Sequence, residues 1–313
     1  MYYPRMLSMG TRYARLNSHC ACTAVHLTIL HSSASQHFAE LYAVAPSAQV
    51  EQQALHQRLS RELEAIREEV AACKDAEAQE CLEYVLYQRA GSSPLIFPNS
   101  PYPRDRDQNG VRADRVGADG LGFTLADFVA SREAQKARLS VAHIVALRLY
   151  STAAFKALNS PLRDHGRTEA HPLAATVFLL ADGIKKLRAL DAENRSLDLW
   201  RGMRNLGASE AFIQSGGTEF AIMSTTSDPT VAVRYALGDS SLLFKLRADS
   251  FMDRGADIAF LSAFPSEREY VYPPLTYLKP TGKLETIHVA AGEVGDGSPE
   301  TSITVLEVQP HVV

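Results

Sequence analysis

The chain has 313 residues, of which 46% are hydrophobic and 22% are charged, an ordinary composition for a globular protein of one large or two modest domains. A formal net charge of −4 argues against electrostatic binding of nucleic acid. No stretch approaches the roughly 18 uninterrupted apolar residues of a membrane-spanning helix, so no membrane span is predicted.

The amino-terminal segment, residues 1–48, is unusual in its charges. It has no Asp or Glu before Glu40, but it has several arginines and serines. This bias is typical of organellar targeting segments, and the apolar run at 21–30 resembles a poor secretory signal. A flexible or wrongly assigned start would explain it equally well. We expect a flexible or targeting segment and leave the compartment unknown, with an intracellular location favoured.

All the cysteines lie in the first 81 residues, so the rest of the chain does not depend on disulfides. His19, Cys20 and Cys22 together resemble half of a metal site. No second pair of ligands with suitable spacing follows, and no metal is predicted.

Two patterns follow, a helical one over residues 49–90 and a linker over 91–120. In the first, apolar residues recur at spacings of three and four. This stripe consists of Leu55, Leu59, Leu63, Ile66, Val70 and Cys73. Its short length favours a helical hairpin, with a coiled coil for self-association as the alternative. Residues 91–120 are rich in proline, glycine and mixed charges, which predicts a linker.

Residues 121–313 are predicted to form one domain that begins with helices. Thr124 and Asp127 have the spacing of a capping box at a helix start, and Ser140 can cap the next helix. His171 and Pro172 are expected to begin a third helix, whose apolar residues lie on one stripe.

From residue 197 the pattern changes to short β-prone runs separated by turns. They are expected at 197–201, 221–225, 242–246, 269–272, 285–289 and 303–308. The pair Gly216-Gly217 lacks the surroundings of a phosphate-binding loop and is expected to form a hairpin turn. Helices followed by strands indicate an α+β protein.

Three polar motifs lie in this strand-rich part. Arg201 precedes Gly202 in a β-prone segment, and the hydroxyl run Ser224-Thr225-Thr226 leads into a helix that begins at Asp228-Pro229. The third motif is Glu267-Arg268-Glu269. Because side chains alternate along a strand, we expect the two carboxylates on the same side with their Cα atoms roughly 6.5–7 Å apart, where both can reach one substrate.

An arginine, then Ser-Thr-Thr, then Glu-x-Glu, in this order, resembles the pattern of the arginine-specific mono-ADP-ribosyltransferases. Residues 150–163 also resemble the helix that precedes the catalytic core of that family. The resemblance implies an α+β ADP-ribosyltransferase fold, in which N-terminal helices are followed by two packed antiparallel β-sheets that form an NAD cleft. The family motif usually ends in serine. Thr226 keeps the hydroxyl but restricts χ1, so we expect altered tuning without loss of function.

The resemblance also implies NAD as co-substrate, no metal, and a protein acceptor that bears an arginine. The nicotinamide–ribose bond breaks through an oxocarbenium-like transition state, whose positive charge Glu269 would stabilise through the ribose hydroxyls. Arg201 would bind the pyrophosphate with its forked donors. The other residues implied to bind the cofactor are Gly202, Ser224, Thr225 and Thr226. Ser224 and its two threonine neighbours would also orient Glu269.

Glu267 is implied to select arginine as acceptor. A substrate guanidinium is almost always protonated, so a carboxylate beside it can bind it and accept a proton during attack. Two nearby carboxylates should raise the pKa of one of them. Phe264 would lie on the substrate-recognising loop, although a core phenylalanine fits equally well. Asp257 is expected in a turn or structural bond. Tyr235 could line the nicotinamide pocket, but its helical spacing from Val231 favours core packing.

The sequence is also compatible with two other functions. An NAD glycohydrolase would use the same pocket with water as acceptor, and only product analysis separates the two. The second alternative is a non-catalytic NAD-binding module that interacts through residues 49–90. The presence of Arg201, Ser224 and Glu269 together counts against that module.

Overall fold

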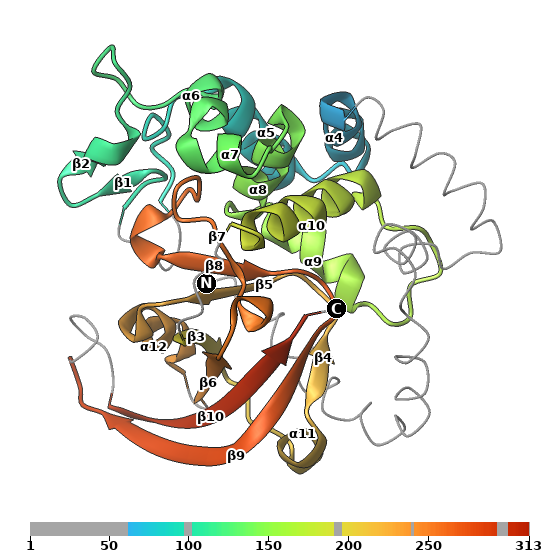
Figure 1. Ribbon diagram of the computed structural model, residues 1–313, viewed down its shortest axis with the longest axis vertical. Coiled ribbons are helices and arrows are strands. Elements are labelled where there is room, and N and C mark those ends of the chain that lie inside the picture. The colour runs from blue at the N-terminus through green and yellow to red at the C-terminus, as the bar shows by residue number, and fades with distance from the viewer. Residues whose placement is uncertain (1–61, 97–101, 191–195, 239–240, 293–299, 313) are drawn as a thin grey trace. The chain divides into compact units, whose positions relative to one another are not determined.

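The computed structural model describes residues 62–96, 102–190, 196–238, 241–292 and 300–312 (Figure 1). The chain divides into two compact units. Within the described residues, the helical unit contains the chain up to Leu190 and the short segment Phe260–Pro265. The sheet unit contains the rest. The segment predicted at 1–48 and its candidate metal ligands lie outside the described residues.

The helical unit is built around α8 (Val141–Tyr150), in which every residue after Val141 is buried. A helix that is buried on all sides is one that neighbouring elements cover completely. The surrounding helices are α4 (Glu62–Ala72), α5 (Ala76–Tyr87), α6 (Leu125–Ala130), α7 (Arg132–Lys136), α9 (Phe155–Arg163) and α10 (Ala174–Arg188). No single described helix is long and apolar enough to cross a membrane, and α8 and α9 pass that test only as a pair bent by 80°.

The predicted helix starts are confirmed at α6 and α8. Thr124 caps α6 and forms a capping box with Asp127. Ser140 caps α8, where His143 takes the reciprocal position of the box. In both cases the side-chain oxygen satisfies a backbone N–H that the first turn leaves without a partner, which is why the helix begins there.

The third helix, α10, begins at Ala174 and not at Pro172. The buried imidazole of His171 accepts the N–H of Leu173 at 2.9 Å and so holds the chain in a turn before the helix. The helix start is then satisfied from α4, because the buried carboxylate of Glu69 accepts the N–H groups of Ala175 at 2.8 Å and Thr176 at 2.9 Å. A long-range cap of this kind leaves no signal near the helix itself.

In residues 62–87 the predicted helical pattern is present as α4 and α5. Ile66 and Val70 of the apolar stripe are buried inside the helical unit, so they do not offer a surface for self-association. Leu55 and Leu59, the first two residues of the stripe, lie outside the described residues.

Residues 102–120 differ from the linker that their composition predicts. Asp105 and Arg115 are fully buried. Between them lie the short strands β1 (Arg106–Asp107) and β2 (Gly110–Val111) and the single turn of η3 (Ala113–Arg115). The prolines and glycines serve turns around a buried charged pair, and composition alone does not distinguish such turns from a solvated linker.

The sheet unit confirms the predicted α+β class. Its strands are β3 (Leu197–Arg204), β4 (Gly217–Glu219), β5 (Met223–Thr226), β6 (Ser241–Ala248), β7 (Ala256–Asp257), β8 (Glu269–Tyr272), β9 (Thr276–Val289) and β10 (Thr301–His311). Among the described residues they form one hydrogen-bonded sheet in the order β4-β9-β10-β6-β3-β5-β8-β7. Figure 1 shows β9 and β10 as its long curved pair.

The expected pair of antiparallel sheets is therefore corrected in two details. The strands form one hydrogen-bonded sheet and not two. In addition, β10 runs parallel to β6, while the other described pairings are antiparallel. A single register pair, Trp200 with Thr226, joins β3 to β5. The sheet thus consists of a larger and a smaller part that meet at one narrow junction, and the polar motifs lie at that junction.

Two clusters of buried apolar residues stabilise the larger part of the sheet. One contains Leu199, Phe244 and Leu306, with the short helix α11 (Glu210–Ser215) packed on it through Phe212. The other contains Ala232 and further residues of α12 (Pro229–Ala236) with those of β6, β9 and β10.

Asp228 and Pro229 begin α12, as predicted. Gly216-Gly217, expected as a hairpin turn, instead ends α11 with Gly216 at φ 71° and starts β4. A left-handed residue that ends a helix is a common place for glycine.

Candidate active site

The strands β5 and β8 bring Ser224 and Glu269 together. Their register pairs Ser224 with Val271 and Thr226 with Glu269, so the serine and the glutamate are diagonal neighbours on adjacent strands. The hydroxyl of Ser224 donates a hydrogen bond to the carboxylate of Glu269. Glu269 is only 8% exposed. Strand register therefore holds a nearly buried carboxylate in one orientation.

Arg201 joins this pair from β3. Its Nη1 donates to the carbonyl oxygen of Ser224 at 2.7 Å. The guanidinium thus adds a second link at the narrow junction between β3 and β5, next to the Trp200–Thr226 pair. The side chain is half-buried, which places a permanent cation beside β5, the strand of Ser224, without enclosing it.

The two threonines hold the backbone around this pair. Thr225 donates its hydroxyl to the carbonyl oxygen of Tyr270 at 2.9 Å. Thr226 donates to the carbonyl oxygen of Glu267 at 2.5 Å and accepts the N–H of Asp228 at 3.0 Å. Each hydroxyl therefore satisfies a backbone group. The run of hydroxyls on β5 thus fixes the backbone of β8 and of the turns next to the two strands.

Glu267 is placed by a turn and not by strand alternation, which corrects the predicted geometry of the Glu-x-Glu motif. Glu267 ends the 3-10 turn η5 (Pro265–Glu267), and Glu269 begins β8. Arg268 between them is left-handed, with φ 47°. Alternation needs three extended residues in a row, and this segment has none before Glu269. The two carboxylates are nevertheless close enough for Glu269 to raise the pKa of Glu267.

Burial and the neighbouring charge of Glu269 raise the pKa of Glu267 to about 8. The hydroxyl of Tyr235 donates to the Glu267 carboxylate at 3.0 Å and opposes that rise by favouring the charged form. Tyr235 was expected in the core, but it is only half-buried and directs its hydroxyl to the site. Its contact partner lies 32 residues away, so helical spacing could not reveal it.

The remaining candidate residues have different surroundings. A Cβ atom on Gly202 would lie 1.9 Å from the carbonyl oxygen of Ala232, so this glycine lets α12 approach β3. Phe264 belongs to the helical unit, where its side chain is buried. Asp257 accepts the N–H of Ala259 at 2.9 Å, the structural bond that was expected.

Chemically, the sheet unit combines a permanent cation, a nearly buried carboxylate with an oriented hydroxyl, and a second carboxyl whose pKa is near neutrality. The oriented carboxylate can stabilise a reaction centre that becomes positive, and the cation can hold an anionic part of the substrate. The second carboxyl can exchange a proton at physiological pH. Among the described residues, no group of three or more His, Cys, Asp or Glu side chains is arranged to hold a metal ion.

The family model of the NAD:arginine ADP-ribosyltransferases matches residues 129–291. The chain is similar to the solved ADP-ribosyltransferase HopU1 of Pseudomonas syringae pv. Tomato DC3000, with 19% identity over 63% of this chain and 93% of that one and a TM-score of 0.41. The toxin Plx2a of Paenibacillus larvae has 14% identity over 59% and 94%, with a TM-score of 0.42.

A eukaryotic mono-ADP-ribosyltransferase, ART2.2 in complex with NADH, has 13% identity over 82% of this chain and 87% of that one, with a TM-score of 0.45. No curated protein matches the sequence.

Proposed function

Because this chain belongs to the NAD:arginine ADP-ribosyltransferase family, we propose that it transfers ADP-ribose from NAD to an arginine of a protein acceptor and releases nicotinamide. The observation that carries the proposal is the hydrogen bond from Ser224 to the nearly buried Glu269, with Arg201 bonded to the same serine residue. The alternatives with water as acceptor, or with no reaction at all, are separated by the experiment below.

Glu269 stabilises the transition state of nicotinamide loss. As the bond between nicotinamide and ribose breaks, positive charge develops on the ribose, and a carboxylate at its hydroxyls interacts with it more strongly than with the ground state. The bond from Ser224 keeps the carboxylate oriented before NAD arrives. Arg201 holds the pyrophosphate, since a guanidinium offers several N–H donors in one plane.

Glu267 receives the acceptor. A guanidinium nitrogen of the substrate forms the bond to ribose C1, nicotinamide leaves with the electrons of its former bond, and the displaced guanidinium proton passes to Glu267. A carboxyl group with a pKa of about 8 suits this step. An arriving guanidinium cation favours its ionised form, so the base is generated when the acceptor binds.

The test is a reaction of the full chain with NAD and an excess of agmatine, a small arginine mimic, followed by mass measurement of nicotinamide and ADP-ribosyl-agmatine. The full chain is used because residues before 115 contribute buried groups to the helical unit. We expect both products from the parent and neither from Glu269→Ala. Glu267→Gln should lose the adduct and keep part of the nicotinamide release.

Three other outcomes would change the assignment. Nicotinamide without adduct would favour a glycohydrolase or an acceptor more demanding than agmatine. Neither product from a folded sample that binds NAD would favour a binding module. An equal loss of both products in Glu267→Gln would show that this residue does not act on the acceptor.

A further inference from the structure

The loop between β7 and β8 leads directly into Glu267, and its middle belongs to the helical unit. The segment Phe260–Pro265 is assigned to that unit, while Ala259 and Ser266 on either side belong to the sheet unit. Leu261, Ser262 and Ala263 are all essentially inaccessible to solvent. A loop whose central backbone is this deeply buried must have partners for its polar groups.

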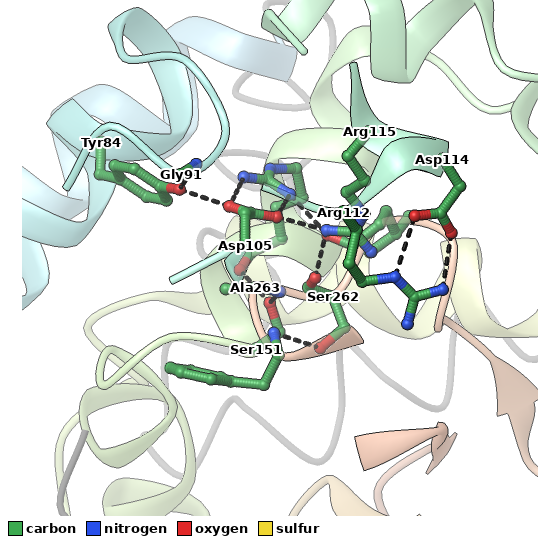
Figure 2. A network of polar contacts seen from close by, with 12 residues as sticks. Tyr84, Gly91, Asp105, Arg112, Asp114, Arg115, Ser151, Ser262 and Ala263 are labelled. Carbon is green, nitrogen blue, oxygen red and sulfur yellow. Dashed lines mark hydrogen bonds and ion pairs between the residues drawn. The ribbon is translucent and has the colours of Figure 1, made fainter. Parts of the chain in front are cut away.

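Those partners come from residues that are distant in the sequence (Figure 2). The guanidinium of Arg148 donates to the carbonyl oxygen of Leu261 at 2.7 Å, and Arg115 donates to that of Ser262 at 2.5 Å. The loop residue Ala263 is held on both sides of its backbone. Its carbonyl oxygen accepts the N–H of Asp105 at 2.7 Å, and its N–H donates to the hydroxyl of Ser151 at 2.9 Å.

Asp105 organises this network. Its fully buried carboxylate accepts hydrogen bonds from Arg115, Arg148 and the hydroxyl of Tyr84. Burial alone would raise the pKa of Asp105, but the guanidinium groups of Arg148 and Arg115 outweigh burial and hold that pKa below its ordinary value. The carboxylate is therefore charged at neutral pH.

The charges explain why the loop is part of the network. Two buried guanidinium groups, those of Arg115 and Arg148, share the one carboxylate of Asp105. Their remaining need for acceptors is met in part by the loop carbonyl oxygens and, for Arg148, by the ring of Phe128 at 3.9 Å. Removal of the carboxylate would leave two like charges together in a buried site, and the loop would lose its fixed donors.

Beyond the anchored residues, the chain has little freedom before it reaches the acceptor site. After Ala263 it enters η5, which ends at Glu267, and the carbonyl oxygen of Glu267 accepts from Thr226. Glu269, in contrast, is held by the register of β8 with β5. The two glutamates thus depend on different supports.

We propose that Asp105, Arg115 and Arg148 are positioning residues for Glu267: they anchor the loop that leads to it and so determine how efficiently an arginine competes with water for ADP-ribose. This inference rests on the proposed function. It gives the segment around residues 102–120 a role in acceptor use, although that segment contains none of the family motifs.

The experiment compares Asp105→Asn, Ser151→Ala and the parent as full chains. Asp105→Asn removes the central charge with little change of shape, and Ser151→Ala removes one acceptor from the loop and spares the charges. Glu69→Gln is the matched control, because Glu69 is also a buried carboxylate of the helical unit but bonds to α10.

Two readouts are needed. The first is the ratio of ADP-ribosyl-agmatine to free nicotinamide, together with kcat/KM for agmatine. We expect Asp105→Asn to lower kcat/KM for agmatine about 10- to 100-fold, the range for a misplaced reacting group, while nicotinamide release without agmatine changes less than about threefold. Ser151→Ala should lower kcat/KM for agmatine and the ratio of adduct to nicotinamide by a smaller factor. Glu69→Gln should leave that ratio unchanged.

The second readout is hydrogen exchange of peptides that cover residues 260–267, and it does not depend on activity. Exchange there should become faster by about fivefold or more in Ser151→Ala, from the loss of one hydrogen bond, and should stay as in the parent in Glu69→Gln. If Asp105→Asn does not fold, Ser151→Ala decides. Parental exchange and a parental product ratio in Ser151→Ala would overturn the inference. An inactive parent would instead refute the proposed function, while the exchange data would still decide whether the anchor exists.

Discussion

Replacement of Tyr235 by phenylalanine tests whether Glu267 is the base that arginine transfer requires. The Tyr235 hydroxyl donates to this carboxylate at 3.0 Å and opposes the burial and the Glu269 charge that raise the pKa of Glu267 to about 8. Hydrogen bonds to charged groups contribute about 1.5–3 kcal/mol, and we take the lower end because Glu267 is half-buried. Since one pKa unit equals about 1.4 kcal/mol, Tyr235→Phe should raise this pKa by about one unit.

The assay is kcat/KM for agmatine between pH 6 and pH 10. In the parent the value should rise about tenfold per pH unit and level off near the pKa of Glu267, about 8. In Tyr235→Phe the levelling should occur about one unit higher, so that the variant is about tenfold slower at pH 7 and equal to the parent at pH 10. The guanidine of agmatine stays protonated throughout this range, so it does not add a second pH dependence to kcat/KM.

Release of nicotinamide without agmatine is the control, because it does not need Glu267 to accept a proton. If kcat/KM for agmatine levels off at the same pH in Tyr235→Phe as in the parent, the Tyr235 hydrogen bond does not lower the pKa of Glu267 and its assigned role is refuted. If kcat/KM for agmatine still rises with pH in Glu267→Gln, Glu267 is not the base.

Three further predictions concern the same unit. Ser224→Ala removes the donor that orients Glu269 and should lower nicotinamide release and transfer together, about 10- to 100-fold in kcat/KM, whereas a selective loss of transfer would contradict this role. Gly202→Ala places a Cβ 1.9 Å from the carbonyl oxygen of Ala232 and should destabilise the fold by about 1–3 kcal/mol in chemical denaturation; parental stability would show that α12 can shift freely. Glu267→Gln should be more stable than the parent by at least about 1.4 kcal/mol at pH 9 and equal to it below pH 4.5. Between pH 4.5, the ordinary pKa of the unfolded chain, and about pH 8, the folded parent keeps a proton on Glu267 that the unfolded chain has already released, so parental stability falls as pH rises through this range. Thermal unfolding at both pH values checks this, and an equal difference at both would contradict it.

The short-range features of this chain were predictable from its sequence. Glu269–Tyr272 is a strand with the expected bounds, and the caps at Thr124, Ser140 and Asp228 are where the residue types indicate. Each of these features depends on side chains within a few residues of one another. The order of the polar motifs also sufficed to indicate the family.

Where the structure differs from the sequence-based predictions, contacts between distant segments are the cause. Residues 102–120 have the composition of a linker, but Asp105 is buried because two guanidinium groups neutralise it, one from Arg115 in the same segment and one from the distant Arg148. Tyr235 lies on α12, which packs closely against β3 at Gly202, and its hydroxyl bonds to Glu267, 32 residues away in the sequence. Neither contact leaves a periodic or local signal.

The sequence by itself determined which groups can perform the chemistry, because the residue types at Arg201, Ser224 and Glu269 and the strand propensity around them are local properties. Only the tertiary structure decided how the second carboxyl is presented. Glu267 is set by a left-handed residue, a threonine bond and a tyrosine hydroxyl, and its pKa depends on burial and on the charge of Glu269. Burial and electrostatic interaction depend on distances through space, which a linear order of residues does not contain.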